Sequence, residues 1–217
     1  MKQPEQFDLL IFGASGHAKV ACDCARFAYP RLLMLSGDEI EGEWNGVDIV
    51  PESRKNLSEW HEVCSKAFVA IGNNQIRSRV QVKLDNAGFT IVSLFYPSAI
   101  VSPTASFGAG TLICPCAVVN ADAKVGKGCI VNTGAIIEHE CVIGDYSHVS
   151  PGAVLGGGVG LGAYAWICAG ASIADHTSVG SHSVVGAGAA VVADIPEYVL
   201  AAGVPAIIKK RFEHSEI

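Results

Sequence analysis

The chain has 217 residues, of which half are hydrophobic and 24 are glycine, while only 17% are charged. This composition allows a sizeable buried core and argues against a disordered chain. A formal net charge of −6 argues against nucleic acid or an anionic membrane surface as the main partner.

The first 95 residues alternate short apolar runs with helical patterns. We expect strands over 7–12, 32–35, 67–71 and 90–94, and helices after residue 16, within 52–64 and over 75–87. Strands that alternate with helices are typical of a small parallel α/β domain. The sequence therefore predicts a Rossmann-like α/β domain over residues 1–95.

A glycine-containing loop, Gly13-Ala14-Ser15-Gly16-His17, directly follows the first predicted strand. Backbone amides at such a strand–helix turn suit phosphate oxygens. A second loop, 72–74, ends another strand, and ligands bind at the carboxyl ends of parallel strands. NAD is disfavoured, because the loop lacks the full dinucleotide fingerprint and only Asp38 offers an acid after the second strand. A tight turn without a ligand is the alternative.

A repeat of six residues governs the second half of the chain. From Val101 to Val191 every sixth residue is apolar, at sixteen positions without a break, and a mostly small residue follows four positions later. Neither a helix nor a long strand has this period. The pattern indicates a hexapeptide repeat, in which each hexad forms a short strand and a corner, and three hexads close one triangular coil of 18 residues. We predict a β-helix over 96–195 without projecting loops, followed by a cap and tail over 196–217.

The 18-residue period aligns particular side chains on successive coils, about 5 Å apart. His139 aligns with Gly157, and His148 aligns with Trp166. The glycine leaves room beside the imidazole, and we expect its N–H to be open. This arrangement suits acyl transfer, because the ring can accept a proton while the amide polarises a thioester carbonyl. The alternative is that polar residues only fill outward positions of the coil.

The remaining histidines and the cysteines predict no further site. His176 and His182 occupy the same position of successive hexads, so they do not stack, and we interpret both as surface residues. The eight cysteines include no C-x-x-C pair, so we expect buried thiols and no metal. The first residues lack the features of a signal peptide, and no apolar run approaches the ~20 residues of a membrane span. We therefore expect a cytoplasmic protein without membrane insertion.

Four segments carry a resemblance to a known family: I-F-G-A-S-G-H-A, A-I-G-N-N-Q-I-R, the stretch from Ile130 to Ala153 that contains H-E-C-V-I-G-D-Y-S-H, and A-G-V-P-A. With them the chain resembles the bacterial sugar O-/N-acyltransferases, which include the sialic acid O-acetyltransferases and the PglD-like UDP-4-amino-sugar N-acetyltransferases. The resemblance covers nearly the whole chain. It implies that the β-helix is left-handed and that the protein forms a homotrimer.

The resemblance also implies a role for each matching residue. His139 matches the general base, Glu140 the acid that raises its basicity, and Asn132 a polar residue near the reacting centre. The residues that match the acetyl-CoA groove are His148, Gly157, Ala169 and Ala187. Those that match the nucleotide-sugar loops are Ser15, Gly16, His17, Gly72 and Gln75, together with Gly37 and Asp38 where family members often have two acids.

The activity implied by the resemblance is an acetyl-CoA-dependent, metal-free N-acetyltransferase. Its substrate would be the 4-amino group of a UDP-4-amino-4,6-dideoxy-sugar of the UDP-N-acetylbacillosamine type. Three alternatives stay open: an O-acetyltransferase of sialic acid or another sugar, a non-catalytic sugar-nucleotide-binding scaffold, and a metal-dependent enzyme of the carbonic anhydrase type. The sequence leaves open the exact sugar, the acyl group, the glycan pathway and the effect of Gly37 in place of a family acid.

Overall fold

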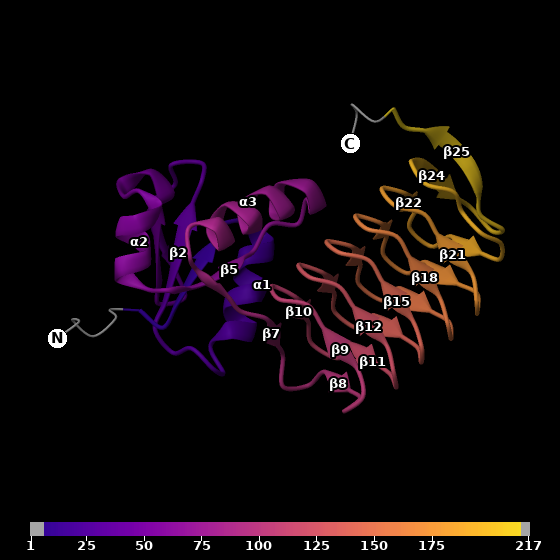
Figure 1. The fold of residues 1–217 in the computed structure, drawn as a ribbon, viewed down its shortest axis with the longest axis horizontal. Helices are drawn as coiled ribbons and strands as arrows, with labels where there is room; N and C mark the ends of the chain where they lie inside the picture. Colours follow the sequence, from indigo (N-terminus) through magenta and orange to yellow (C-terminus); the bar gives the residue numbers. More distant parts are fainter. Residues whose placement is uncertain (1–6, 214–217) are drawn as a thin grey trace. The chain divides into compact units, whose positions relative to one another are not determined.

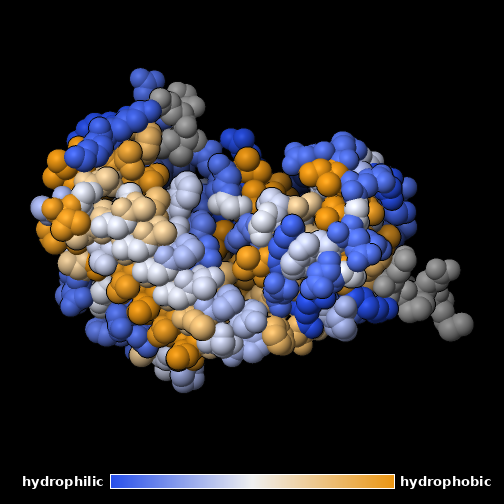
Figure 2. Space-filling model, turned by 180° about the vertical axis from the view of Figure 1, so that it is seen from behind, coloured by the Kyte–Doolittle hydropathy of each residue, from blue (hydrophilic) through white to orange (hydrophobic). Residues whose placement is uncertain are grey.

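The computed structural model describes residues 7–213. Two compact units follow one another along the chain, with the boundary between Phe95 and Tyr96. Figure 1 shows helices packed around a sheet in the first unit and a stack of short strands in the second. On the face drawn in Figure 2, hydrophobic and hydrophilic residues are interleaved rather than separated. Within the described residues, no helix combines the length and the hydrophobicity that a membrane span requires.

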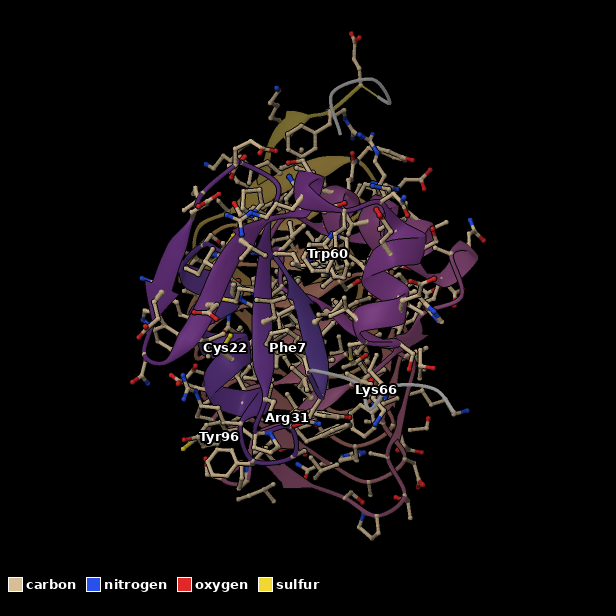
Figure 3. All side chains as sticks on the ribbon, turned by 90° about the vertical axis from the view of Figure 1, so that its left-hand side faces the viewer. Phe7, Cys22, Arg31, Trp60, Lys66 and Tyr96 are labelled. Atoms are coloured by element: carbon tan, nitrogen blue, oxygen red, sulfur yellow. The ribbon has the colours of Figure 1, made fainter. Side chains whose placement is uncertain are left out.

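The first unit contains a six-stranded sheet of order β3-β4-β2-β1-β5-β6, in which only β3 runs antiparallel to its neighbour. The strands are β1 (Leu9–Phe12), β2 (Leu32–Ser36), β3 (Gly42–Trp44), β4 (Val47–Pro51), β5 (Lys66–Val69) and β6 (Thr90–Ile91). The helices are α1 (Gly16–Ala25), the 3₁₀ turn η1 (Glu52–Arg54), α2 (Leu57–Val63) and α3 (Asn74–Asn86). In Figure 3, Arg31 and Lys66 mark the amino ends of β2 and β5 at the same end of the sheet. The carboxyl ends of the parallel strands therefore also share one end.

Burial explains why the central strands are apolar throughout. All four residues of β1 are buried, as expected for a parallel strand covered on both faces. Leu10 and Phe12 pack in one core with Trp60 of α2. A capping box between Asn56 and Glu59 fixes the start of α2, because each side chain accepts the other residue's backbone N–H.

Two predictions of secondary structure in this unit are wrong or incomplete. The hairpin β3–β4 was not predicted; its turn residues Asn45 and Gly46 both have positive φ, at 48° and 77°. Two positive φ angles are the signature of the type I′ hairpin turn. The strand expected over 90–94 is two short strands, β6 and β7 (Leu94–Phe95), because β6 ends at Ile91.

The second unit is a parallel β-helix with three faces. The first face contains β10 (Leu112–Ile113), β13 (Ile130–Val131), β16 (His148–Val149), β19 (Trp166–Ile167), β22 (Val184–Val185), β24 (Val199–Ala202) and the antiparallel β25 (Ile207–Arg211). The second face contains β8 (Ile100–Val101), β11 (Val118–Val119), β14 (Ile136–Ile137), β17 (Val154–Leu155), β20 (Ser172–Ile173) and β23 (Ala190–Val191). The third face contains β9 (Ser106–Phe107), β12 (Lys124–Val125), β15 (Val142–Ile143), β18 (Gly160–Leu161) and β21 (Ser178–Val179).

The sixteen two-residue strands β8 to β23 end at the sixteen periodic apolar positions, so the hexapeptide prediction is confirmed. Paired strands are offset by 18 residues, as in Ile137 with Leu155 and Val149 with Ile167. The periodic apolar residues and the small residues four positions later form one buried core. In Figure 1 the strands lie one above another on successive coils.

Close approach of successive coils explains the glycine that follows many apolar positions. A Cβ on Gly144 would clash with the backbone nitrogen of Ala163 on the next coil and would lie 2.9 Å from its Cα. A Cβ on Gly126 would lie 2.8 Å from the backbone nitrogen of Asp145. Backbone atoms cannot yield as a flexible side chain can, so these positions require glycine for the spacing of the coils.

Candidate active site

His139 and Glu140 lie in the turn that follows β14, the corner between the second and third faces. The Nδ1 atom of His139 lies 3.1 Å from Oε2 of Glu140, and both side chains are more than half exposed. A solvent-screened pair of this kind adds little stability. Its effect is on the ring: a proton on Nδ1, donated to Glu140, leaves Nε2 as the acceptor.

Gly157 lies against the His139 ring, as the 18-residue spacing predicts. A Cβ on Gly157 would lie 2.7 Å from both Cε1 and Nε2 of His139. The next residue, Gly158, donates its backbone N–H to the carbonyl of His139 at 2.8 Å. The absence of a side chain at 157 is therefore what admits the ring, and the acceptor nitrogen Nε2 borders this space.

The expectation of an open N–H at Gly157 is wrong. This amide donates to Oδ1 of Asp175 at 3.1 Å. Asp175 follows β20, one coil beyond Gly157, and its side chain is exposed. The 18-residue spacing applied a second time would have placed Asp175 in line with His139 and Gly157.

A second group of predicted residues lies on the first face. His148 of β16 is buried, with its ring stacked on Trp166 of β19 at a centroid distance of 5.9 Å and an interplanar angle of 5°. The Nδ2 group of Asn132 donates to Nε2 of His148 at 3.1 Å. Trp166 donates from Nε1 to Oγ of Ser150 at 2.8 Å and stays 44% exposed. Asn132 thus contacts His148, and no hydrogen bond joins it to His139 among the described residues.

Ala169 and Ala187 occupy the same position of successive coils, in the turns that follow the first face, and both are exposed. They therefore lie near the face that carries His148. Along the chain, the strands of the second face separate these turns from the turn of His139. Within one chain, His139 and Gly157 thus lie at one edge of the second face, while the predicted cofactor residues Ala169 and Ala187 lie at the opposite edge, next to the face of His148.

The first unit carries a cavity of about 340 Å³ at the carboxyl ends of β1, β2 and β5. Four predicted substrate residues line it: Ser15, Gly37, Asp38 and Gly72. Gly16, His17 and Gln75 are not among its lining residues, so the structure does not bring all seven together. Glu52, which was not predicted as a site residue, also lines it. At Gly37 an added Cβ would meet no atom within 4 Å, so the backbone neighbours do not require glycine there.

Arg77 supports this cavity and was not predicted. Its buried guanidinium donates from Nη1 to the carbonyls of Ile71 and Gly72, at 2.9 and 3.0 Å, and from Nη2 to Oδ1 of Asn74 at 2.8 Å. Burial, with a smaller contribution from the charge of Arg77, lowers the pKa of His17 to about 4. His17 is therefore neutral near pH 7, and Arg77 is the positive charge behind the two loops.

The interpretation of His176 and His182 as surface residues holds for His176 and is wrong for His182. The His182 ring is partly buried and stacks between Tyr164 and Tyr198, with centroid distances of 4.7 and 4.8 Å. Tyr164 stacks in turn on Tyr146 at 5.5 Å. We call these four residues the ring ladder. They occupy one turn position of successive coils with φ near 60°, so the ladder is a contact between coils.

Metal binding and thiol chemistry were the remaining possibilities for the cysteines and acids of residues 7–213. Among residues 7–213, no group of three or more His, Cys, Asp or Glu side chains is placed to hold a metal ion. Six of the eight cysteines are buried, while Cys168 is partly buried and Cys116 is exposed, contrary to the expectation of buried thiols throughout. Burial raises the pKa of the Cys22 and Cys24 thiols to about 12, so neither is a thiolate nucleophile near pH 7.

Comparison with known proteins finds a matching family for each of the two units. Residues 8–84 match the family described as PglD N-terminal domain, and residues 122–157 match the bacterial transferase hexapeptide family, with six repeats. The structure of PerB from Caulobacter crescentus, in complex with CoA and GDP-perosamine, is 36% identical. That match covers 94% of this chain and 97% of PerB, with a TM-score of 0.88.

Two further solved structures are similar over comparable lengths. The acetyltransferase domain of PglB from Neisseria gonorrhoeae is 35% identical over 93% of this chain and 98% of that domain, with a TM-score of 0.86. WeeI from Acinetobacter baumannii is 25% identical over 93% of this chain and 99% of its own, with a TM-score of 0.85. The predicted fold class, a Rossmann-like α/β domain followed by a left-handed parallel β-helix, is confirmed.

Proposed function

The chain belongs to the PglD-like family of bacterial sugar acyltransferases and is an acetyltransferase; from this premise we propose the reaction that its residues perform. The acyl donor is acetyl-CoA, and the acceptor is the amine of a nucleotide-linked amino-sugar. Structures of PerB and of the PglB domain contain CoA or acetyl-CoA, and PerB also binds GDP-perosamine. The observation that carries the proposal is the His139–Glu140 pair, whose free ring nitrogen Nε2 borders the space left by Gly157.

His139 acts as the general base. The neutral amine attacks the thioester carbonyl, so a C–N bond forms and the carbonyl oxygen gains negative charge. Nε2 of His139 takes the proton that the amine loses. The C–S bond then breaks, and the same proton passes to the sulfur of the departing CoA. Glu140 accepts from Nδ1, which keeps the ring in the tautomer that has Nε2 free.

The cavity of the first unit binds the nucleotide part of the acceptor. Its lining combines the loop residues 13–15 and Gly72 with the acidic residues Asp38 and Glu52. Strand–helix loops of this kind suit phosphate oxygens, and Arg77 adds positive charge behind them. We propose a UDP-linked 4-amino-4,6-dideoxy-sugar as the acceptor, which the match to the PglD N-terminal domain supports.

Acetyl-CoA lies in a groove between the coils of neighbouring subunits in a homotrimer. The support is that Gly157 lies beside His139 in one chain, whereas the other predicted cofactor residues, His148, Ala169 and Ala187, lie on the first face or in the turns that follow it, across the second face from His139. A second subunit brings such edges together. Co-expression of His139→Ala with His148→Ala chains tests this, because mixed trimers would contain some sites with both residues intact. No recovery of activity relative to either variant alone contradicts a shared site.

The test of the activity is a panel of acceptors incubated with acetyl-CoA and the full-length protein. We expect CoA release with a UDP-4-amino-4,6-dideoxy-sugar, and an N-acetylated product by mass spectrometry. Activity with GDP-perosamine alone would correct the nucleotide but keep the reaction. Activity only with sialic acid or other hydroxyl acceptors, or no acetyl transfer to any acceptor, would refute the proposal.

A further inference from the structure

Three consecutive glycines, Gly156, Gly157 and Gly158, form the turn above His139. A Cβ on each would clash with a different side chain from a neighbouring coil. The position beside Gly156 is filled by Oδ1 of Asp175, that beside Gly157 by the His139 ring, and that beside Gly158 by Nδ1 of His176. The turn is therefore enclosed by side chains on both sides.

Asp175 is the acidic member of this enclosure. His139, Gly157 and Asp175 are spaced by 18 residues, so they occupy one position on three successive coils. The Gly157 N–H donates to Oδ1 of Asp175 at 3.1 Å, while the His139 ring lies on the other side of the same glycine. The turn is further fixed because His176 donates its backbone N–H to the Gly157 carbonyl at 2.8 Å.

The bond to Asp175 occupies the one backbone N–H of Gly157, beside the His139 ring. A carbonyl that reacts beside Nε2 develops negative charge, and it needs a donor such as the Gly157 N–H. A carboxylate on the same N–H would repel that charge. The Asp175 side chain is exposed, so it can turn into solvent when the acyl group arrives.

We propose that Asp175 is a positioning residue that holds the Gly157 N–H in the free enzyme and releases it to the thioester carbonyl. This inference rests on the proposed function, because it requires acetyl-CoA to bind with its carbonyl at Gly157. Free CoA has no acyl carbonyl, so its binding leaves the bond to Asp175 intact. Asp175 should therefore weaken the binding of acetyl-CoA and leave that of CoA unchanged.

The test is calorimetric titration of the full-length protein and its Asp175→Ala variant with CoA and with a non-reactive ketone analogue of acetyl-CoA. We expect the variant to bind the analogue about 10-fold more tightly. This factor corresponds to the lower end of the range for hydrogen bonds to charged groups, which applies because Asp175 is exposed. We expect its affinity for CoA to stay within about twofold of the wild type, since CoA displaces no hydrogen bond at Gly157. Asp175→Asn keeps an acceptor without the charge, and it serves if the alanine variant does not fold.

Asp145→Ala is the matched control. Oδ1 of Asp145 accepts the backbone N–H of Lys127 at 3.0 Å, with the same 18-residue spacing but at another corner of the coil. Its loss should affect stability and leave the affinity ratio of analogue to CoA unchanged. An Asp175 variant that changes both affinities equally, changes neither, or weakens the analogue overturns the role of Asp175 alone. Failure of the wild type to bind either ligand overturns the proposed function as well.

Discussion

Replacement of Gly157 by alanine tests the contact between the glycine turn and the His139 ring. The new Cβ would lie 2.7 Å from Cε1 and Nε2 of His139, whereas carbon atoms in contact are about 3.5–4.0 Å apart. The ring must therefore move by roughly 1 Å. Gly157 is not among the residues with positive φ, so alanine fits the backbone. The exposed imidazole can rotate at a cost of about 0.5–1.5 kcal/mol, the usual cost of an off-rotamer side chain.

The effect on catalysis should be far larger than the effect on stability. A misplacement of about 1 Å at the reacting centre can lower the rate about 10²-fold. We therefore expect kcat of Gly157→Ala to fall by about 10²-fold, with a loss of only about 1 kcal/mol in unfolding free energy. The assay is chromatographic measurement of CoA release at saturating acceptor, together with thermal unfolding of the same preparation.

Gly144→Ala is the contrasting variant. Its Cβ would clash with the backbone of Ala163 rather than with a side chain, and Gly144 follows β15, at a different corner of the coil from His139. We expect a loss of about 1–3 kcal/mol or more in unfolding free energy, as for other overpacked sites, and unchanged kcat per folded enzyme. A Gly157→Ala enzyme with the kcat of the wild type would refute the reasoning, because His139 would then tolerate displacement.

Three further variants probe other parts of the molecule. The pKa of His17 is lowered to about 4 in the folded protein, so the unfolded chain binds the proton first as the pH falls below about 6.5. The unfolding free energy of the wild type should therefore fall by about 2 kcal/mol more than that of His17→Gln between pH 7 and 5. Urea unfolding followed by tryptophan fluorescence measures this in a Trp166→Phe background, which leaves only the tryptophans of the first unit. Equal dependence of the unfolding free energy on pH in the two proteins would contradict it. In His182→Asn, asparagine tolerates the positive φ but lacks the ring and its two stacking contacts, so the unfolding free energy should fall by about 1–3 kcal/mol. The control is Asp122→Asn, at a positive-φ turn position without a ring contact. Equal losses of unfolding free energy in the two variants would show that the ring ladder adds no stability. Glu140→Gln should lower kcat about 10-fold with little change in KM, since it affects only the orientation and charge of the base; a change confined to KM would contradict this.

The β-helix could be predicted in detail because one geometric rule governs it. An uninterrupted 18-residue period fixes which residues share a position on successive coils, so Gly157 beside His139 and Trp166 beside His148 followed from counting. Counting does not fix the direction of a side chain. The bond from Gly157 to Asp175 depends on the rotamer of that aspartate, and this is why the amide predicted to be open is occupied.

The first unit could be predicted less fully because its features depend on particular sites rather than on a period. The helical pattern around Arg77 marks an arginine as a surface residue, and only the packed structure shows it buried behind the loops. The hairpin β3–β4 carries a readable signal, since Asn45-Gly46 is a preferred type I′ turn. Strand β3 has no buried residue and β4 contains the exposed Asp48 between buried residues, so neither has the continuous apolar run of β1 and β2.

The central claim is that His139 is the general base of an amino-sugar nucleotide N-acetyltransferase. The most direct test is the rate of acetyl transfer by His139→Asn with both substrates saturating, compared with the wild type on the acceptor identified by the panel. We expect kcat to fall by about 10²-fold or more, with binding of CoA retained in calorimetry. A His139→Asn enzyme that binds CoA and transfers acetyl groups at the wild-type rate would contradict it.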